Sequence, residues 1–174
     1  MYEIIKVYKQ QVPALRFIGK KYGDSDRENG WFTAKWDEWS RNKWFDLVDQ
    51  ECGINVRDIF EEADASIGLL RVKDGDPFEY WIGKFMPAGT PVPDGFDCIE
   101  FPASTLGVCW VYGKEENEEI FGHEPECAKK LEEAGYPVQQ DKDGVWWHFE
   151  RYVPSRMNSP DEKGNVILDI CYFI

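Results

Sequence analysis

A carboxylate and a phenol lie two residues apart near the end of the chain, in the segment Trp146–Val153. If this segment is a strand, His148, Glu150 and Tyr152 project from one face, because side chains alternate between the two faces of a sheet. Burying an ionised glutamate is costly unless a partner compensates for the lost water. On a buried face Glu150 would therefore carry a proton or bind a cation, and on an exposed face it would be an ordinary solvated residue.

The chain is also rich in aromatic side chains, with eight tryptophans. Trp36 and Trp39 have helical spacing, whereas Tyr80 and Trp110 lie in segments typical of strands. Each aromatic face attracts a cation by about 0.5 to 2 kcal/mol. We therefore expect Glu150, Trp36, Trp39, Tyr80 and Trp110 to bind flat, apolar, often positively charged molecules. The alternative for each ring is the hydrophobic core, and a one-residue change of register would turn Tyr80 or Trp110 to the other face.

The same residues could carry out general acid–base chemistry. With its pKa raised by apolar surroundings, Glu150 would act as a base on water, while Tyr80 or Tyr152 would orient the water or protonate a leaving oxygen. The sequence indicates no second carboxylate for this role. It contains no G-x-S-x-G, H-E-x-x-H, P-loop or G-x-G-x-x-G motif, which argues against the common hydrolase, metalloprotease and nucleotide-binding sites.

His123 and Cys127 are four residues apart, a spacing at which a helix could hold a metal ion on one face. Two further ligands would be needed, for which Glu124 and His148 are the candidates. We expect a polar surface here rather than a metal site, and no cofactor. The five cysteines are odd in number and widely spaced, without a C-x-x-C pair, which is typical of reduced cytosolic thiols.

The net charge limits the possible partners of the protein. The formal charge is −13, and no cluster of Lys and Arg interrupts the acidic composition. Such a surface repels phosphate backbones and anionic lipids, so direct binding to nucleic acid or membrane is disfavoured. The apolar runs are too short to span a bilayer, and the first residues lack the order of a signal peptide. We expect a cytoplasmic protein.

A chain of 174 residues has the size of one domain. Helical spacing predicts one helical region over residues 31–52, with a break near Asn42, and a helix over 125–134 that ends at Gly135. Alternating or apolar runs predict strands at residues 2–9, 15–18, 66–72, 78–86, 96–101, 105–112, 146–153 and 165–174. We expect 66–72 and 78–86 to form a hairpin, and 96–101 to pair with 105–112.

The order of elements repeats after a bridge rich in Pro and Gly at residues 86–95. Residues 13–23 and 102–113 both run from Pro-Ala to Tyr-Gly, at an offset of about ninety. We therefore predict an α+β fold of two β-α-β-β units, at about 1–88 and 96–174. Their strands would form one antiparallel sheet with both helices on one face and a ligand cleft at the seam. The alternative is an unrelated α+β order.

Five further segments form an ordered set of motifs: Phe78–Phe85, Val92–Phe96, Ile99–Ala103, Val108–Gly113 and Phe149–Pro154. This set resembles the GyrI-like domain, which also occurs as the effector-binding half of AraC-type and multidrug-sensing MerR-type regulators. Two early segments, Arg16–Tyr22 and Trp36–Trp39, are similar to a free-standing branch of this family in bacteria and archaea. The resemblance covers nearly the whole chain.

This resemblance implies a single GyrI-like domain over residues 1–174, with an aromatic cleft around a central glutamate that Glu150 matches. In regulators the domain is joined to a helix-turn-helix, for which this chain has no residues to spare. We expect sensing or sequestration of small, flat, apolar or cationic drug-like molecules. Two alternatives are hydrolysis of cyclopropane-bearing electrophilic toxins in the same cleft, and an acidic protein-interaction factor such as a gyrase modulator, whose partner is unknown.

Overall fold

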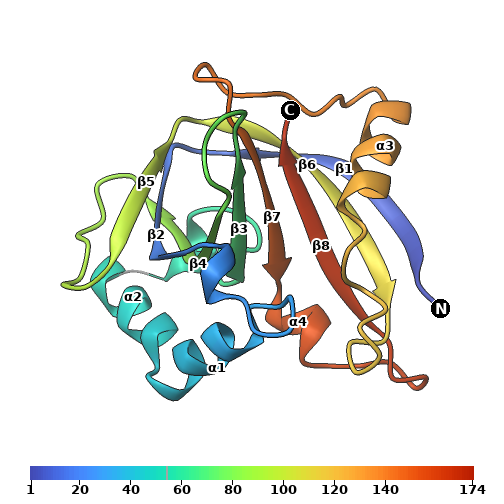
Figure 1. The fold of residues 1–174 in the computed structure, drawn as a ribbon, viewed down its shortest axis with the longest axis horizontal. Coiled ribbons are helices and arrows are strands. Elements are labelled where there is room, and N and C mark those ends of the chain that lie inside the picture. Colours follow the sequence, from blue (N-terminus) through green and yellow to red (C-terminus); the bar gives the residue numbers. More distant parts are fainter. Residues whose placement is uncertain (54) are drawn as a thin grey trace.

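The computed structural model describes residues 1–53 and 55–174, and it shows an α+β fold built on one eight-stranded antiparallel sheet (Figure 1). The strands are β1 (Glu3–Val12), β2 (Leu15–Tyr22), β3 (Ser66–Val72), β4 (Glu79–Pro87), β5 (Asp97–Phe101), β6 (Ser104–Gly113), β7 (Trp146–Tyr152) and β8 (Val166–Phe173). The helices are α1 (Thr33–Arg41), α2 (Trp44–Cys52), α3 (Glu124–Glu133) and α4 (Pro154–Met157), with short 3-10 turns at Asp24–Asp26 and Val56–Asp58. None of the helices in the described ranges is long and apolar enough to cross a bilayer.

The helices begin and end where local signals place them. The expected break near Asn42 separates α1 from α2, and Lys43 follows it with a φ of 53°, in the left-handed region that turns the chain. At the other end of the fold, Gly135 has a φ of 85° and closes α3, where the Tyr136 amide donates to the Leu131 carbonyl at 2.8 Å. Glycine adopts this conformation without steric cost, which explains the end of the helix.

The strand order β1-β6-β8-β7-β3-β4-β2-β5 contains the two predicted β-α-β-β units. The first unit consists of β2, α1 with α2, β3 and β4, and the second consists of β6, α3, β7 and β8. Across the sheet, the strands of the second unit lie in the order β6-β8-β7, and those of the first unit lie in the mirrored order β3-β4-β2. The two units meet where β3 pairs with β7. This junction, the β3–β7 seam, lies in the middle of the sheet.

The predicted pairing of residues 96–101 with 105–112 is wrong. Strand β5 pairs with β2, while β6 pairs with β1 and β8. The turns before β2 and β6 contain Pro13-Ala14 and Pro102-Ala103. A two-residue hairpin needs positive φ angles, which proline cannot adopt. Strand β1, which precedes the first unit, therefore pairs with the outer strand β6 of the second unit. Strand β5, which precedes the second unit, pairs with the outer strand β2 of the first unit.

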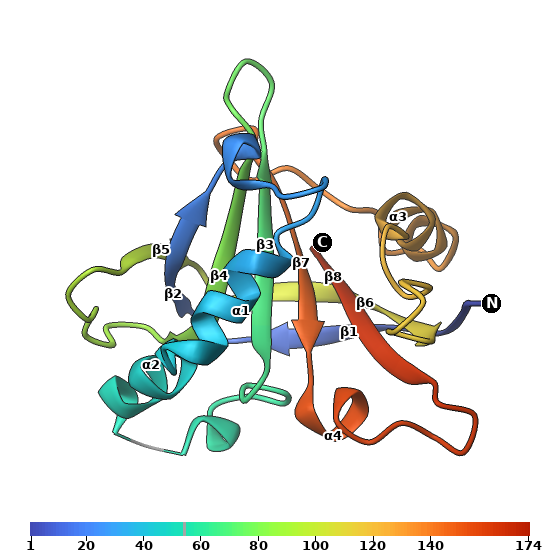
Figure 2. The same ribbon diagram turned by 60° about the horizontal axis from the view of Figure 1, so that its bottom comes forward.

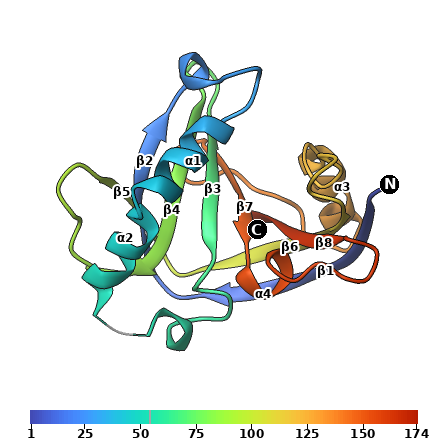
Figure 3. The ribbon, with the colours of Figure 1, turned by 90° about the horizontal axis from the view of Figure 1, so that it is seen from below.

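The two faces of the sheet are covered differently. Helices α1 and α2 lie over β4 and β3, and α3 lies over β6 and β8 on the same face, so the seam between them is left without a helix (Figures 2 and 3). The opposite face carries the core cluster of Phe17, Phe85 and Phe149. At the border of this cluster, the ring of Phe101 in the edge strand β5 stacks on the ring of Phe173 in β8, with the ring centroids 5.0 Å apart. The sheet therefore curls around this cluster.

A buried ionic network holds β7 in place beside the seam. Arg151 is 1% exposed, and its guanidinium donates to Asp169 of β8 at 2.8 Å and to Gln10 of β1 at 2.7 Å. Asp169 also accepts from Arg156 of α4 at 2.6 Å. Buried charges that are paired and hydrogen-bonded in this way fix one arrangement of the strands. Arg151 lies on the face opposite α1 and α3, so its neighbours Glu150 and Tyr152 must point toward these two helices.

Candidate ligand-binding site

The seam is the floor of a cavity of about 550 Å³ between α1 and the loop that leads into α3. Leu70 of β3, Tyr80 of β4, and Glu150 and Tyr152 of β7 project into it from the sheet. One wall comes from residues 27–37, and the other comes from residues 115–124. A cleft of this size is typical of a site for a small organic molecule.

Glu150 lies at the base of this cavity and is held by two tyrosines. The hydroxyl of Tyr152 donates to Glu150 Oε2 at 2.9 Å, and the hydroxyl of Tyr80 donates to the same oxygen at 3.2 Å. The indole N–H of Trp36 in turn donates to the Tyr80 hydroxyl at 3.0 Å. Both tyrosines use one carboxylate oxygen, and Oε1 has no hydrogen-bond partner among the described residues, so it is free to contact a ligand.

A glycine in β3 makes room for this arrangement. Gly68 is directly opposite Glu150 on one side and Ile82 on the other, in the middle of the seam. A Cβ atom at this position would lie 2.9 Å from Glu150 Oε2 and closer still to the Tyr80 hydroxyl. The absence of a side chain at Gly68 therefore allows the two side chains to meet above the strand.

The electrostatics of the site follow from its burial. Burial raises the pKa of Glu150 to about 7, and the nearby charge of Glu124 adds to this effect, while the hydrogen bonds from Tyr152 and Tyr80 lower the pKa. Burial, and then the Glu150 charge, hold the pKa of both tyrosines well above the usual range. The tyrosines are therefore hydrogen-bond donors at neutral pH, and the carboxyl group changes its charge near neutrality.

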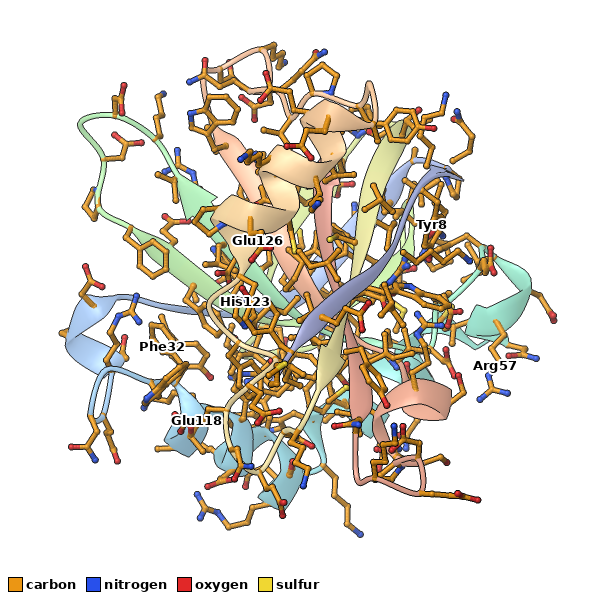
Figure 4. All side chains as sticks on the ribbon, turned by 90° about the vertical axis from the view of Figure 1, so that its right-hand side faces the viewer. Tyr8, Phe32, Arg57, Glu118, His123 and Glu126 are labelled. Atoms are coloured by element: carbon orange, nitrogen blue, oxygen red, sulfur yellow. The ribbon has the colours of Figure 1, made fainter. Side chains whose placement is uncertain are left out.

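Aromatic rings form much of the wall of the cavity. Phe32 stacks on Tyr80 with ring centroids 4.2 Å apart and planes within 1°, and Trp36 meets Tyr152 edge to face at 4.8 Å. The stick view shows Phe32 on the side of the molecule where Glu118 and His123 also lie (Figure 4). The seven aromatic residues that line the cavity are Trp31, Phe32, Trp36, Phe78, Tyr80, Phe121 and Tyr152.

The remaining lining is strongly acidic. Its carboxylates are Asp37, Glu115, Glu116, Glu118, Glu124 and Glu150, and Arg27 is the one cationic side chain in the described lining. The guanidinium of Arg27 is already engaged by Asp24 at 3.0 Å and lies over the rings of Phe32 and Phe78. The cavity therefore combines π faces with an excess of negative charge, and both attract organic cations.

The structure brings four of the predicted residues together, namely Glu150, Tyr80, Tyr152 and Trp36. It does not bring Trp39 to the cavity. Trp39 is completely buried under α1, where its N–H donates to the Tyr22 hydroxyl at 3.0 Å and its ring packs on Trp44, Phe45 and Phe96. Three residues along a helix is less than a full turn, so Trp39 is rotated from Trp36 toward the core.

Trp110 is also placed away from the cavity. Its ring projects from the opposite face of β6, next to Tyr8, with the Lys6 ammonium 4.4 Å from its centroid and the Arg156 guanidinium 4.5 Å from it. Its neighbours Cys109 and Val111 face the helices instead. The register of β6 thus places Trp110 outside this cavity.

The second wall of the cavity was not found from sequence. Residues 114–123 form turns with no hydrophobic periodicity, so no pattern placed Glu115, Glu118, Phe121 or Glu124 near Glu150. The sequence does contain a signal for Phe32 on the first wall. Phe32 lies four residues before Trp36, about one helical turn, so helical spacing places the two rings on the same side.

The hypothetical metal site does not assemble. The Nε2 atom of His123 is 2.7 Å from the Glu119 carbonyl oxygen, and its ring stacks on Tyr2 at 3.6 Å. Cys127 is buried beside Cys109, and His148 stacks on Tyr172 at 5.2 Å, with its pKa lowered to about 4 by burial. Across residues 1–53 and 55–174, no three His, Cys, Asp or Glu side chains are grouped so that they could hold a metal ion.

Comparison with protein-family models and with curated proteins gives no match. Two solved structures are similar over nearly the whole chain. One is a protein of Staphylococcus aureus MU50 assigned provisionally to bacterial transcription regulation, with a TM-score of 0.54, 16% identity and 97% of both chains covered. The other is SAV2435 bound to tetraphenylphosphonium, with a TM-score of 0.56, 16% identity, and 97% of this chain and 93% of that chain covered. The chain therefore has the fold of these two proteins, as its resemblance to the GyrI-like domain implies.

Proposed function

We propose that this protein binds lipophilic aromatic cations, flat or bulky, in the cleft around Glu150, and that it acts as a sensor or sequestering protein for drug-like molecules. The observation that carries the proposal is the carboxylate of Glu150, held by two tyrosine hydroxyls at the base of an aromatic cavity of about 550 Å³. A cation at the free Oε1 atom would compensate for the buried charge, and the surrounding rings would add cation–π attraction.

The comparisons support this proposal at the level of the fold. The structure of SAV2435 holds tetraphenylphosphonium, a bulky aromatic cation, and the present chain shares that fold over 97% of its length. The resemblance of residues 149–154 to a GyrI-like motif points to the same ligand class, because the glutamate of that motif is matched by Glu150.

Tetraphenylphosphonium is therefore the first ligand to test. Its dissociation constant would be measured at pH 8 by tryptophan fluorescence and by calorimetry for the wild type, for Glu150→Gln and for Glu162→Gln. We expect Glu150→Gln to weaken binding at least about tenfold, because the amide offers no charge to the cation. Glu162 is an exposed residue outside the cleft, so Glu162→Gln removes the same charge without touching the site. Equal affinity of all three proteins would contradict the proposal.

A hydrolase remains the second candidate because of one specific observation. A carboxyl group with a pKa near 7, next to two tyrosine hydroxyls, has the properties that a general base for water requires. Incubation with a cyclopropane-bearing alkylator, followed by mass spectrometry of the small molecule, tests this candidate. If the wild type adds one water molecule to the alkylator and Glu150→Gln does not, the result supports hydrolysis. If the small molecule stays unchanged with the wild type, only binding remains as the function.

A further inference from the structure

The cavity contains two separate places where a positive group of a ligand could contact both a carboxylate and aromatic rings. The inner one is at the seam, where Glu150 lies among Tyr80, Tyr152 and Trp36. The outer one is at the mouth and consists of the rings of Trp31 and Phe121 with the carboxylates of Glu115, Glu116 and Glu118. We call these the inner and the outer subsite.

The outer subsite joins the two walls of the cavity. Trp31 lies in the loop that precedes α1, and Phe121 lies in the loop that precedes α3, yet their ring centroids are 6.2 Å apart, with an angle of 61° between the ring planes. Trp31 is 45% exposed, which is unusual for so large an apolar side chain. The pair therefore presents aromatic surface to whatever enters the mouth.

Among the described residues, the protein supplies few cationic partners for the carboxylates of the outer subsite. Within residues 1–53 and 55–174, Glu115 and Glu118 form no ion pair, and Glu116 reaches only Lys114, at 4.0 Å on the surface. The turn that carries them is closed by a hydrogen bond from the Glu118 amide to the Glu115 carbonyl at 2.9 Å. Glu118 itself has a φ of 57°, a conformation that costs energy for a residue with a side chain. The three negative charges therefore lie on one short turn at the mouth.

A ligand with one positive charge can satisfy only part of this cavity. Bound at Glu150, it would leave the outer carboxylates uncompensated on the wall that also carries Glu124, whose charge raises the pKa of Glu150. A second positive group at the mouth would meet both the outer carboxylates and the π faces of Trp31 and Phe121. A flat spacer between the two groups would run along the aromatic wall.

We propose that the cleft selects dications in which a flat aromatic or apolar spacer joins two positive groups, one at the inner and one at the outer subsite. This inference rests on the proposed function, because it assigns the first positive group to Glu150. It adds the substrate class and the residues that discriminate: Trp31, Phe121 and the carboxylates of residues 115, 116 and 118.

The test compares two ligands with the same skeleton. One is an aromatic bis-amidine, and the other carries a neutral carboxamide in place of one amidine. Because the second amidine adds a charge interaction and a cation–π contact, we expect the bis-amidine to bind the wild type about 10- to 100-fold more tightly. Calorimetry at pH 8 gives both dissociation constants.

Two triple variants locate the effect. The outer triple variant is Glu115→Gln/Glu116→Gln/Glu118→Gln, and its affinity for the bis-amidine should fall at least about tenfold. Its affinity for the ligand with a single amidine, the mono-amidine, should fall no more than about threefold, because only the long-range electrostatic field becomes weaker for that ligand. The control Glu51→Gln/Glu132→Gln/Glu162→Gln removes the same charge from exposed positions outside the cavity and should affect both ligands only slightly.

The outcomes separate the two proposals. If neither amidine binds and tetraphenylphosphonium does not bind either, the proposed function fails and this inference fails with it. If both amidines bind equally well to the wild type, or if the control triple reduces the preference as much as the outer triple, only the dication inference is overturned.

Discussion

In the proposed function, the negative charge of Glu150 attracts the ligand, whereas the same charge destabilises the free protein. Its pKa is raised from the ordinary 4.5 to about 7, which means that the folded chain holds the neutral form more readily than the unfolded chain does. Relative to a neutral side chain, ionised Glu150 therefore destabilises the fold above pH 7 and has no such effect below pH 4.5. Strain of this kind is common at binding sites.

Glu150→Gln should consequently stabilise the free protein. We expect a gain of about 1 to 3 kcal/mol in the free energy of unfolding at pH 8, because the amide carries no charge and its oxygen still accepts from the tyrosines. At pH 4 the difference should vanish, since the carboxyl group is then protonated. Urea denaturation at both pH values measures this, with Glu162→Gln as the control. A loss of stability at pH 8 would show that Glu150 is not desolvated.

The pH dependence of cation binding should report the same group. Binding requires ionised Glu150, so the affinity for tetraphenylphosphonium should fall as the pH drops through 7, by about 30-fold between pH 8 and pH 5.5. The hydrogen bond from Tyr152 lowers the pKa of Glu150, so Tyr152→Phe should move the midpoint upward by about 0.5 to 1 pH unit. Titrations of affinity against pH check both statements, and an unchanged midpoint in Tyr152→Phe would contradict the assignment to Glu150.

At the scale of the elements, the seam strands matter because they set distances that loops could not hold. Strands β3, β4 and β7 bring Glu150 and Tyr80 together from positions seventy residues apart in the sequence. Gly68 lies between them, and its lack of a side chain leaves the space in which the Tyr80 hydroxyl reaches the carboxylate.

Gly68→Ala should therefore damage the site more than the fold. The new methyl group would push the Tyr80 hydroxyl away from Glu150, while the far ends of both side chains can move. We expect at least about a fivefold loss of affinity for tetraphenylphosphonium, with a change in the free energy of unfolding of no more than about 1 kcal/mol. Calorimetry and urea denaturation on the same sample give the two values. Unchanged affinity would mean that the Tyr80–Glu150 contact does not contribute to binding.

The sequence predicted most helices and strands, but it predicted only part of the candidate site. Alternation and helical spacing identified the segments of the sheet and the helices, and they placed Glu150 and Tyr152 on one face because a period of two leaves no other choice. Trp39 and Trp110 were misplaced because helix rotation and strand register depend on tertiary packing. The acidic loop at residues 115–124 could not be assigned to the site, because a turn without periodicity carries no signal about its neighbours in space.

For the whole molecule, the formal charge of −13 acts on every cationic ligand before contact. The acidic mouth of the cavity concentrates this field, and salt screens it. Raising the NaCl concentration from about 0.02 M to about 0.5 M should weaken tetraphenylphosphonium binding by about 3- to 10-fold, mostly through a slower association rate. Stopped-flow fluorescence measures the rate. A neutral aromatic ligand should show no such loss, and equal salt effects for both ligands would argue against electrostatic attraction.

The crossing of β1 and β5 has a consequence for how the molecule could be divided. If the backbone were cut in the bridge between β4 and β5, each fragment would carry the edge strand of the other: β1 would still need β6, and β5 would still need β2. Such interlocked pieces should fold only together, with the ligand at their shared boundary strengthening the association. If the proposed function holds, reassembly of the two fragments would therefore report the presence of an aromatic cation.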